Sequence, residues 1–288
     1  MIDMLNSLFI SPITDYIFMQ RALSACIVLS IICPILGVVL LLKRMSLMGE
    51  ALSHGILPGI AIAFFIWGIW LPGFTIGGII AGLIIAGLSV FVSQKTNLPQ
   101  DASFSGFYLM ALALGVLLVS KAGGAMNIMH LLFGSVLGVN MPTLLTIAAL
   151  SLLSGIMLRI IFRPLVYQCF DPLFMQSVGC GSNRYTVIFV ALVVINLVSA
   201  CQALGTLMAL GLMMIPAITA RLLCQNLKNT LIVSVIISLI SSYFGLLISY
   251  HVALPTGPTI ILATSFFYCV TLILRFINIQ TIKYSCKQ

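Results

Sequence analysis

The sequence has very few charged side chains. Only 6% of its 288 residues are Asp, Glu, Lys or Arg, whereas 61% are hydrophobic and the mean hydropathy is +1.24. Soluble globular domains are about 25% charged, so this composition excludes a soluble protein and indicates a chain that crosses a membrane several times. The sequence also lacks any long polar stretch, which leaves no room for a soluble nucleotide-binding or catalytic domain. Any energy source must therefore be an ion gradient or a separate subunit.

Several catalytic and metal-binding motifs are absent as well. The sequence contains no P-loop, no G-x-S-x-G nucleophile elbow and no H-E-x-x-H zinc motif. Its 8 cysteines form no C-x-x-C pair, which favours packing or free thiols over disulfides and thiolate metal sites. We therefore expect no enzymatic activity and no tightly bound cofactor, with an intramembrane hydrolase as the alternative.

The net charge of +8 comes from 13 basic and 5 acidic residues. The basic residues are scattered in ones and twos between apolar runs, a pattern that is typical of membrane loops rather than of a nucleic-acid surface. The sequence therefore predicts a protein surrounded by membrane lipid, with no nucleic-acid partner.

Nine apolar segments are long enough to cross a bilayer at about 20 residues per span. The segment 204–222 is the weakest, because Gly205, Gly211 and Pro216 interrupt it, so the count is eight or nine. We expect an all-α polytopic integral membrane protein in which residues 1–288 form a single transmembrane domain. The expected spans lie near residues 18–42, 47–70, 74–94, 103–120, 143–162, 185–203, 204–222, 229–251 and 258–276.

The basic residues also predict the orientation. If the N-terminus lies outside and the chain crosses nine times, every Lys and Arg except Arg21 and Lys121 falls on the inner side. An excess of Lys and Arg marks the cytoplasmic loops of membrane proteins. We therefore expect the N-terminus outside and the C-terminus inside.

Glu50 and His54 are the strongest candidates for a functional site. They lie four residues apart within the span 47–70, and a charged group at bilayer depth costs roughly 3 kcal/mol. Residues at this spacing share one helix face, and a carboxylate with an imidazole is a suitable ligand pair for Mn²⁺, Fe²⁺ or Zn²⁺. Two ligands also permit release of the ion. We interpret the pair as part of a pathway for a divalent transition metal; alternatively, Glu50 reaches the interface or pairs with Lys43 or Arg44.

The same span contains features that affect helix geometry and packing. Pro58 predicts a kink one turn beyond His54. Gly59 permits close helix approach, and Gly78 with Gly82 forms a G-x-x-x-G pair in the next span. We expect these glycines to serve packing.

Two further histidines are weaker metal-ligand candidates. His251 precedes the sequence ALPTGPT, and His130 lies in the irregular stretch 121–140. Both are expected on the outer side, where either could receive the ion. A single histidine is more often a hydrogen-bonded polar residue than a ligand.

The longest polar interval on the inner side is 163–184. Asp171 can cap a helix that has Pro172 in its first position, and Gly179 can end it. The pattern predicts a short helix near 169–180 on the cytosolic face, with a solvated loop as the alternative. Its apolar anchors would be Phe170, Leu173 and Phe174.

The segment LLKRMSLMGEALSHGILPGIAIAF resembles the membrane subunit of the bacterial ABC transporters that import manganese, zinc or iron with a metal-binding solute receptor. Three further stretches resemble the same family in the same order. They are HLLFGSVLGV (130–139), CFDPLFMQSVG (169–179), and GTLMALGLMMIPAITARLL (205–223) with LPTGPTIIL (254–262). The resemblance covers most of the chain, from about residue 37 to residue 262.

This resemblance implies a homodimeric permease in the bacterial inner membrane, with the translocation path at the subunit interface. It also implies cytoplasmic ABC ATPase subunits and an extracytoplasmic metal-binding receptor as partners. Glu50 and His54 match the acidic residue and the histidine that line the metal pathway, and 169–179 matches the coupling helix that docks into the ATPase. The sequence departs from the family at Glu50, where the family usually has Asp.

Two other functions are weighed against an ATP-driven importer. One is a secondary metal carrier that protons or sodium drive through Glu50. The other is a membrane assembly factor or enzyme that transports nothing. Metal uptake that needs a partner ATPase and survives collapse of the proton gradient would distinguish the importer from both.

Overall fold

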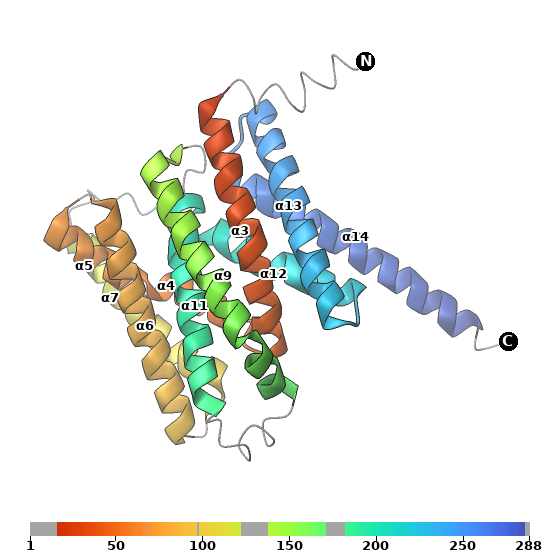
Figure 1. Cartoon of the computed structure of the whole chain (residues 1–288), viewed down its shortest axis with the longest axis horizontal. Helices are drawn as coiled ribbons and strands as arrows, with labels where there is room; N and C mark the ends of the chain where they lie inside the picture. The colour runs from red at the N-terminus through yellow and green to blue at the C-terminus, as the bar shows by residue number, and fades with distance from the viewer. Residues whose placement is uncertain (1–15, 69, 97, 122–137, 171–181, 286–288) are drawn as a thin grey trace.

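The computed structural model describes residues 16–121, apart from 69 and 97, together with residues 138–170 and 182–285 (Figure 1). All regular secondary structure in these residues is helical, which confirms the predicted fold class. The helices are α3 (Ile17–Leu42), α4 (Met48–Gly55), α5 (Leu57–Trp67), α6 (Leu71–Thr96), α7 (Gln100–Lys121), α9 (Met141–Phe170), α11 (Ser182–Leu204), α12 (Thr206–Leu223), α13 (Leu227–Val252) and α14 (Thr256–Ser285).

Nine helical segments in the described residues are long and apolar enough to cross a membrane. They agree with the nine segments expected from the sequence, and α4 and α5 together make the second. The weakest predicted segment is helix α12, which has 18 residues and accommodates Pro216 in its interior. The number of candidate spans in this part of the chain is therefore nine rather than eight.

The helices form two groups that are joined by a third (Figure 1). Helices α4 to α7 pack on one another, and α12, α13 and α14 pack together with α3. Helices α9 and α11 lie between these groups, since α11 packs on both α6 and α12. Helix α4 thus contacts α7 of the first group as well as α11 and α12.

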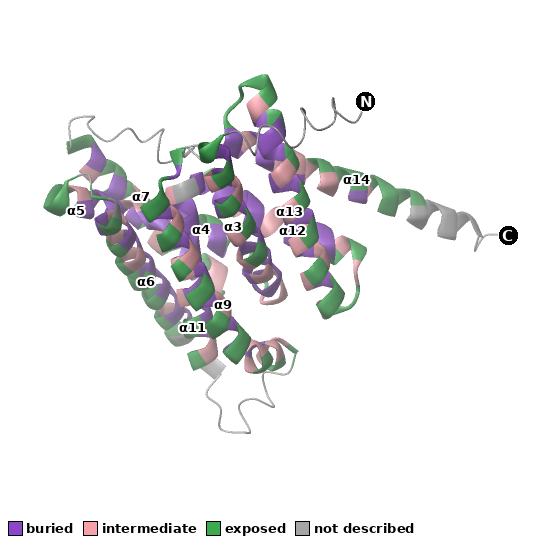
Figure 2. Cartoon of the chain, turned by 45° about the horizontal axis from the view of Figure 1, so that its top comes forward, coloured by how far each residue is buried: buried purple, intermediate pink, exposed green. Residues whose placement is uncertain are grey.

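Burial divides the spans into central and peripheral ones. The α3 span has 61% of its most apolar stretch buried and the α14 span only 17%. Figure 2 shows buried residues where the central helices face one another, whereas residues 273–277 of α14 are all exposed. The exposed apolar faces are suited to contact with lipid or with other subunits.

The second span is interrupted close to Pro58, as the sequence predicts. Helix α4 ends at Gly55, and Ile56 separates it from α5, which has Pro58 in its first turn. Proline is tolerated there because the first turn of a helix has no partner for its N–H groups. The break therefore lies just after His54.

The predicted glycine packing is present around α5 and α6. Gly59 and Gly77 are in backbone contact, because a Cβ added to either would collide with the carbonyl oxygen of the other. Gly78 and Gly82 face valine side chains of α11. These small residues let α6 approach α5 on one side and α11 on the other.

Helix α9 is longer than the sequence predicts. The fifth span was expected to end near residue 162, yet α9 continues to Phe170 with Pro164 inside it. Leu165 is completely buried and Gln168 accepts a hydrogen bond from Lys43. These tertiary contacts extend the helix through a segment whose polarity and proline predict a loop.

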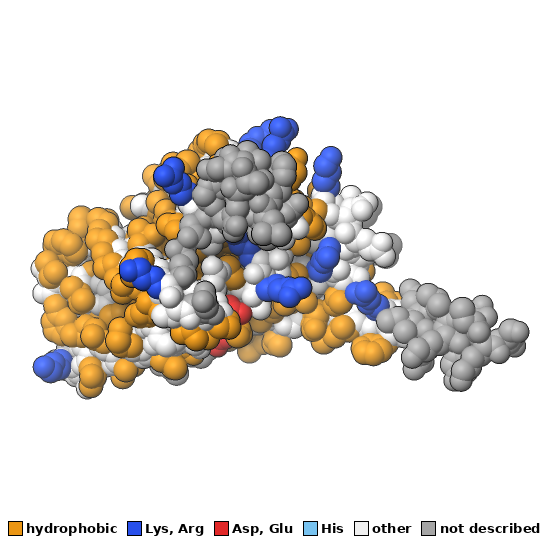
Figure 3. Space-filling view, turned by 90° about the horizontal axis from the view of Figure 1, so that it is seen from below, with side chains coloured by type: hydrophobic (Ala, Val, Ile, Leu, Met, Phe, Trp, Pro, Cys, Tyr) orange, Lys and Arg blue, Asp and Glu red, His pale blue; other side chains and the backbone are white. Residues whose placement is uncertain are grey.

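The two ends of the bundle can be identified from contacts of α3. Tyr16, just before α3, lies 5.7 Å from Tyr250 of α13 between ring centroids. Lys43, just after α3, contacts α9 and α11. Figure 3 shows several Lys and Arg side chains on the face opposite the N-terminal end, a distribution that agrees with the predicted inner side.

Candidate functional site

A tight turn at the end of α3 sets the start of α4. The backbone N–H of Arg44 donates to the Leu41 carbonyl (3.1 Å), and that of Met45 donates to the Leu40 carbonyl (3.0 Å). These are the two hydrogen bonds of a Schellman motif. Arg44 adopts the left-handed φ of 57° that glycine usually supplies, at a cost of about 1 kcal/mol. The turn is therefore closely defined, and it delivers the chain to α4.

Helix α4 carries both predicted metal ligands. Its buried face includes Met48 and Leu52, neither of which is exposed to solvent. Glu50 is exposed and His54 is half-buried, so the carboxylate lies on the open side of the helix. The Ser53 hydroxyl donates to the backbone carbonyl of Glu50 (2.9 Å). This hydrogen bond does not involve the Glu50 carboxylate.

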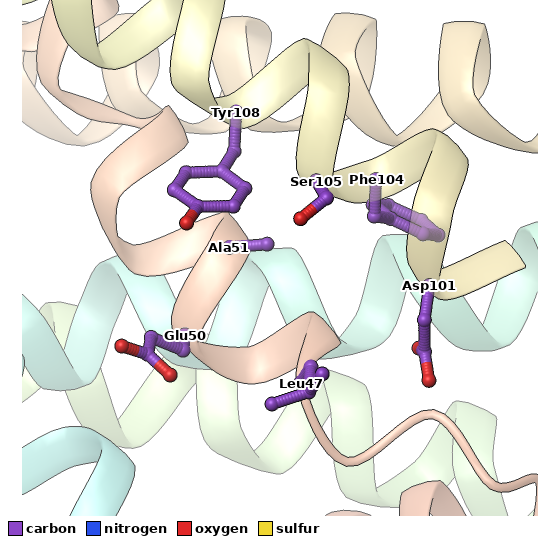
Figure 4. A pocket seen from close by; sticks show the side chains of 7 residues that line it. All are labelled: Leu47, Glu50, Ala51, Asp101, Phe104, Ser105 and Tyr108. Atoms are coloured by element: carbon purple, nitrogen blue, oxygen red, sulfur yellow. The ribbon is translucent and has the colours of Figure 1, made fainter.

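An open pocket adjoins Glu50 (Figure 4). It encloses about 310 Å³, part of which is open solvent. In Figure 4 the carboxylates of Glu50 and Asp101 lie on opposite sides of Leu47, and α7 contributes the Ser105 and Tyr108 hydroxyls. The complete lining is Leu47, Glu50, Ala51, Asp101, Phe104, Ser105 and Tyr108.

Asp101 lines this pocket although it was not among the site residues predicted from the sequence. Within the described part of the chain, Asp101 and Glu50 are the two acidic residues. Asp101 lies in the first turn of α7, where the helix dipole stabilises a negatively charged carboxylate. Its Oδ1 is buried and has no hydrogen-bond partner among the described residues. The available signal was an acidic residue directly before the predicted span 103–120, in a chain with only 5 acidic residues.

The structure does not bring His251 to Glu50 and His54. His251 is exposed in the last turn of α13, and its Nδ1 lies 2.9 Å from the Leu247 carbonyl oxygen. This is the end of the bundle where Tyr16 contacts α13, whereas α4 begins after the opposite end of α3. In the described residues no group of three or more His, Cys, Asp and Glu side chains could hold a metal ion. Glu50 and His54 are thus at most an incomplete coordination shell.

Five of the predicted site residues lie outside the described residues: His130, Asp171, Pro172, Leu173 and Phe174. The predicted coupling helix near 169–180 falls largely in the same region. Phe170 is the last residue of α9 and is 70% exposed.

Comparison with known sequences gives a consistent result over nearly the whole chain. The model of a family described as "ABC 3 transport family" matches residues 15–275. "Chelated iron transport system membrane protein YfeD" of Yersinia pestis is 32% identical over 279 residues, which cover 96% of this chain and 91% of that protein. "Manganese import system permease protein ScaB" of Streptococcus gordonii is 31% identical over 263 residues, covering 91% and 93% respectively.

A solved structure is similar as well. A chain of "PsaBC from Streptococcus pneumoniae in complex with Fab" matches with a TM-score of 0.80 and 30% sequence identity. The match covers 91% of this chain and 94% of that chain. The similarity therefore extends over most of the helical arrangement.

Proposed function

The chain belongs to the ABC 3 transport family, and we propose that it moves divalent manganese or iron across the bacterial inner membrane along a path lined by Glu50 and His54. It is a multi-pass membrane permease subunit of an ABC transporter rather than the ATPase. The names of the relatives support manganese or iron as the substrate. The carboxylate and imidazole of the two residues suit either ion.

The exposure of Glu50 is the observation that carries this proposal. Glu50 belongs to a candidate span, yet it is exposed on the single chain and adjoins an open pocket. A carboxylate that faces hydrocarbon is strongly unfavourable, whereas one that faces a water-filled passage is not. A second copy of the chain covering this side would form such a passage and could supply further ligands. This supports a homodimer with the pathway at its subunit interface.

The decisive experiment is transport by the purified chain in proteoliposomes, assembled with its partner ATPase and its metal-binding receptor. We expect ATP-dependent uptake of manganese or iron that continues after a protonophore collapses the proton gradient. Uptake that stops with the gradient and needs no ATPase would instead support a secondary carrier. A complete assembly that moves neither metal would contradict both.

The partner ATPase is proposed to dock on the segment that follows α9. Two observations support this: α9 ends in the exposed Phe170, and the sequence after it predicts a short helix with Asp171 and Pro172 at its start. Coupling is required because the chain contains no P-loop of its own.

Two substitutions test the docking segment. Phe174→Ala removes a predicted apolar anchor, and Asp171→Lys places a positive charge at the N-terminus of the predicted helix, where the helix dipole would disfavour it. Each is expected to lower ATPase association about tenfold, as loss of a contact worth about 1.4 kcal/mol would. Phe266→Ala, which removes an exposed aromatic ring of α14, is the matched control. Wild-type ATPase copurification and uptake in both variants would contradict the assignment.

A further inference from the structure

The Lys43 side chain joins three helices at the inner end of the bundle. Its Nζ donates to Gln168 Oε1 (3.1 Å) on α9 and to Thr186 Oγ1 (2.8 Å) on α11. Gln168 Nε2 also donates to Thr186 Oγ1 (2.8 Å), which closes the network. The same ammonium lies 6.0 Å from the ring centroid of Phe189 on α11. Lys43 is thus held in one position by two neighbouring helices.

This lysine differs from an ordinary surface lysine. Its side chain is half-buried, and within the described residues no carboxylate forms an ion pair with it. Burial lowers the pKa of the Lys43 ammonium, because desolvation disfavours the charged form, and the negative charge of an ionised Cys169 would oppose this shift. By comparison, Lys95 at the end of α6 is exposed and lies over the Phe91 ring, 4.8 Å from its centroid.

The two hydrogen-bond partners of Lys43 flank the segment proposed to meet the ATPase. Gln168 lies in the last turn of α9, and Thr186 lies near the start of α11. The chain between these two helices is the segment 171–181. The Lys43 ammonium is therefore bonded to both of the helices that this segment connects.

On its other side, Lys43 is connected to the metal-ligand helix through a short and well-defined backbone. Lys43 is the C-cap of α3 and begins the Schellman turn. The Met48 N–H then donates to the Met45 carbonyl (3.2 Å), and α4 starts at Met48. Backbone hydrogen bonds from Arg44, Met45 and Met48 thus define the chain between Lys43 and the start of α4.

We propose that Lys43 is a positioning residue that transmits movement of the α9 and α11 ends to α4, and so changes the placement of Glu50 and His54 during the transport cycle. This inference rests on the proposed function, because it requires ATP-driven transport. The role assigned to Lys43 is neither metal ligation nor nucleotide binding. It acts through its hydrogen bonds to Gln168 and Thr186 and through the turn that follows it.

The test measures metal transported per ATP hydrolysed in the complete reconstituted complex. Lys43→Met keeps an unbranched side chain one atom shorter and removes the donors, so the ratio is expected to fall about tenfold, within the 5- to 150-fold range typical of coupling between sites. Copurification of the ATPase should stay unchanged. Lys95→Met, which changes an exposed lysine at the same end of the bundle, is the control and should keep the wild-type ratio.

Thr186 provides a second test that alters a single polar atom. Thr186→Val removes the acceptor while retaining the side-chain shape, whereas Thr186→Ser retains the hydroxyl. We expect Thr186→Val to lower the ratio and Thr186→Ser to preserve it. Equal effects of both changes would indicate packing and would overturn the inference. If Lys43→Met fails to assemble, this pair decides the question.

The outcomes also separate this inference from the proposed function. Suppose that the wild-type complex transports metal and that Lys43→Met and Thr186→Val both keep the wild-type ratio of metal transported to ATP hydrolysed. This result would overturn the role of Lys43 and leave the proposed function standing. A wild-type complex that shows no ATP-dependent uptake would remove the proposed function, and the role of Lys43 with it.

Discussion

Glu50→Gln and His54→Ala are each expected to reduce metal uptake at least about hundredfold, since changes to groups that merely support metal ligands already cost 10- to 100-fold. Glu50→Gln keeps the size of the side chain and removes its negative charge. His54→Ala removes the imidazole from a half-buried position. The initial rate of manganese or iron uptake into proteoliposomes would be measured with the ATPase and the receptor in excess.

The effect should be confined to transport. Glu50 is exposed and its carboxylate lies outside the packed side of α4, so replacing it leaves the core of the bundle intact. Membrane insertion, dimerisation and basal ATP hydrolysis should therefore remain near wild type. A loss of the folded protein in Glu50→Gln would instead indicate a structural role for the carboxylate.

Two variants serve as matched controls. Glu50→Asp keeps the negative charge and shortens the side chain by one methylene, so it should retain uptake, and any change should concern the preference between metals. His251→Ala changes an exposed histidine at the opposite end of the bundle and should transport at nearly the wild-type rate. A well-expressed Glu50→Gln/His54→Ala double mutant with near-normal uptake would contradict the pathway assignment.

The features that could be predicted from the sequence are those that depend on local composition. The nine spans follow from hydropathy over about 20 residues, a property of each segment alone. The placement of Glu50 and His54 on one helix follows from their position, four residues apart, within one apolar span. The break near Pro58 likewise follows from the chemistry of one residue.

The features that escaped prediction depend on packing between distant segments. Asp101 adjoins the Glu50 pocket because α7 packs on α4, which no local pattern indicates. Lys43 bonds to residues 125 and 143 positions away in the sequence. The extension of α9 to Phe170 depends on the burial of Leu165 and on the bond to Gln168. In each case a tertiary contact determines the outcome.

The close approach of α5 and α6 determines how firmly the end of α4 is held, because α5 follows α4 after the single residue Ile56. This contact depends on glycine. A side chain at Gly77 would meet the Gly59 carbonyl oxygen and would lie 2.8 Å from the Ala63 Cβ. Neither the backbone atom nor the short alanine side chain can move aside without separating the helices.

Gly77→Val is therefore expected to lower the free energy of unfolding by about 3 kcal/mol or more, at the upper end of the usual cost of overpacking. Gly87→Val is the matched control, because Gly87 lies in the same helix and has no atom within 4 Å of a Cβ added there. The two changes share the same intrinsic helix propensity, so their difference reports packing. The apparent melting temperature in detergent and the yield of folded protein would be compared for both. Equal melting temperatures would show that α5 and α6 can separate at little cost, and His54 would then lack the rigid support that a metal ligand at the end of α4 requires.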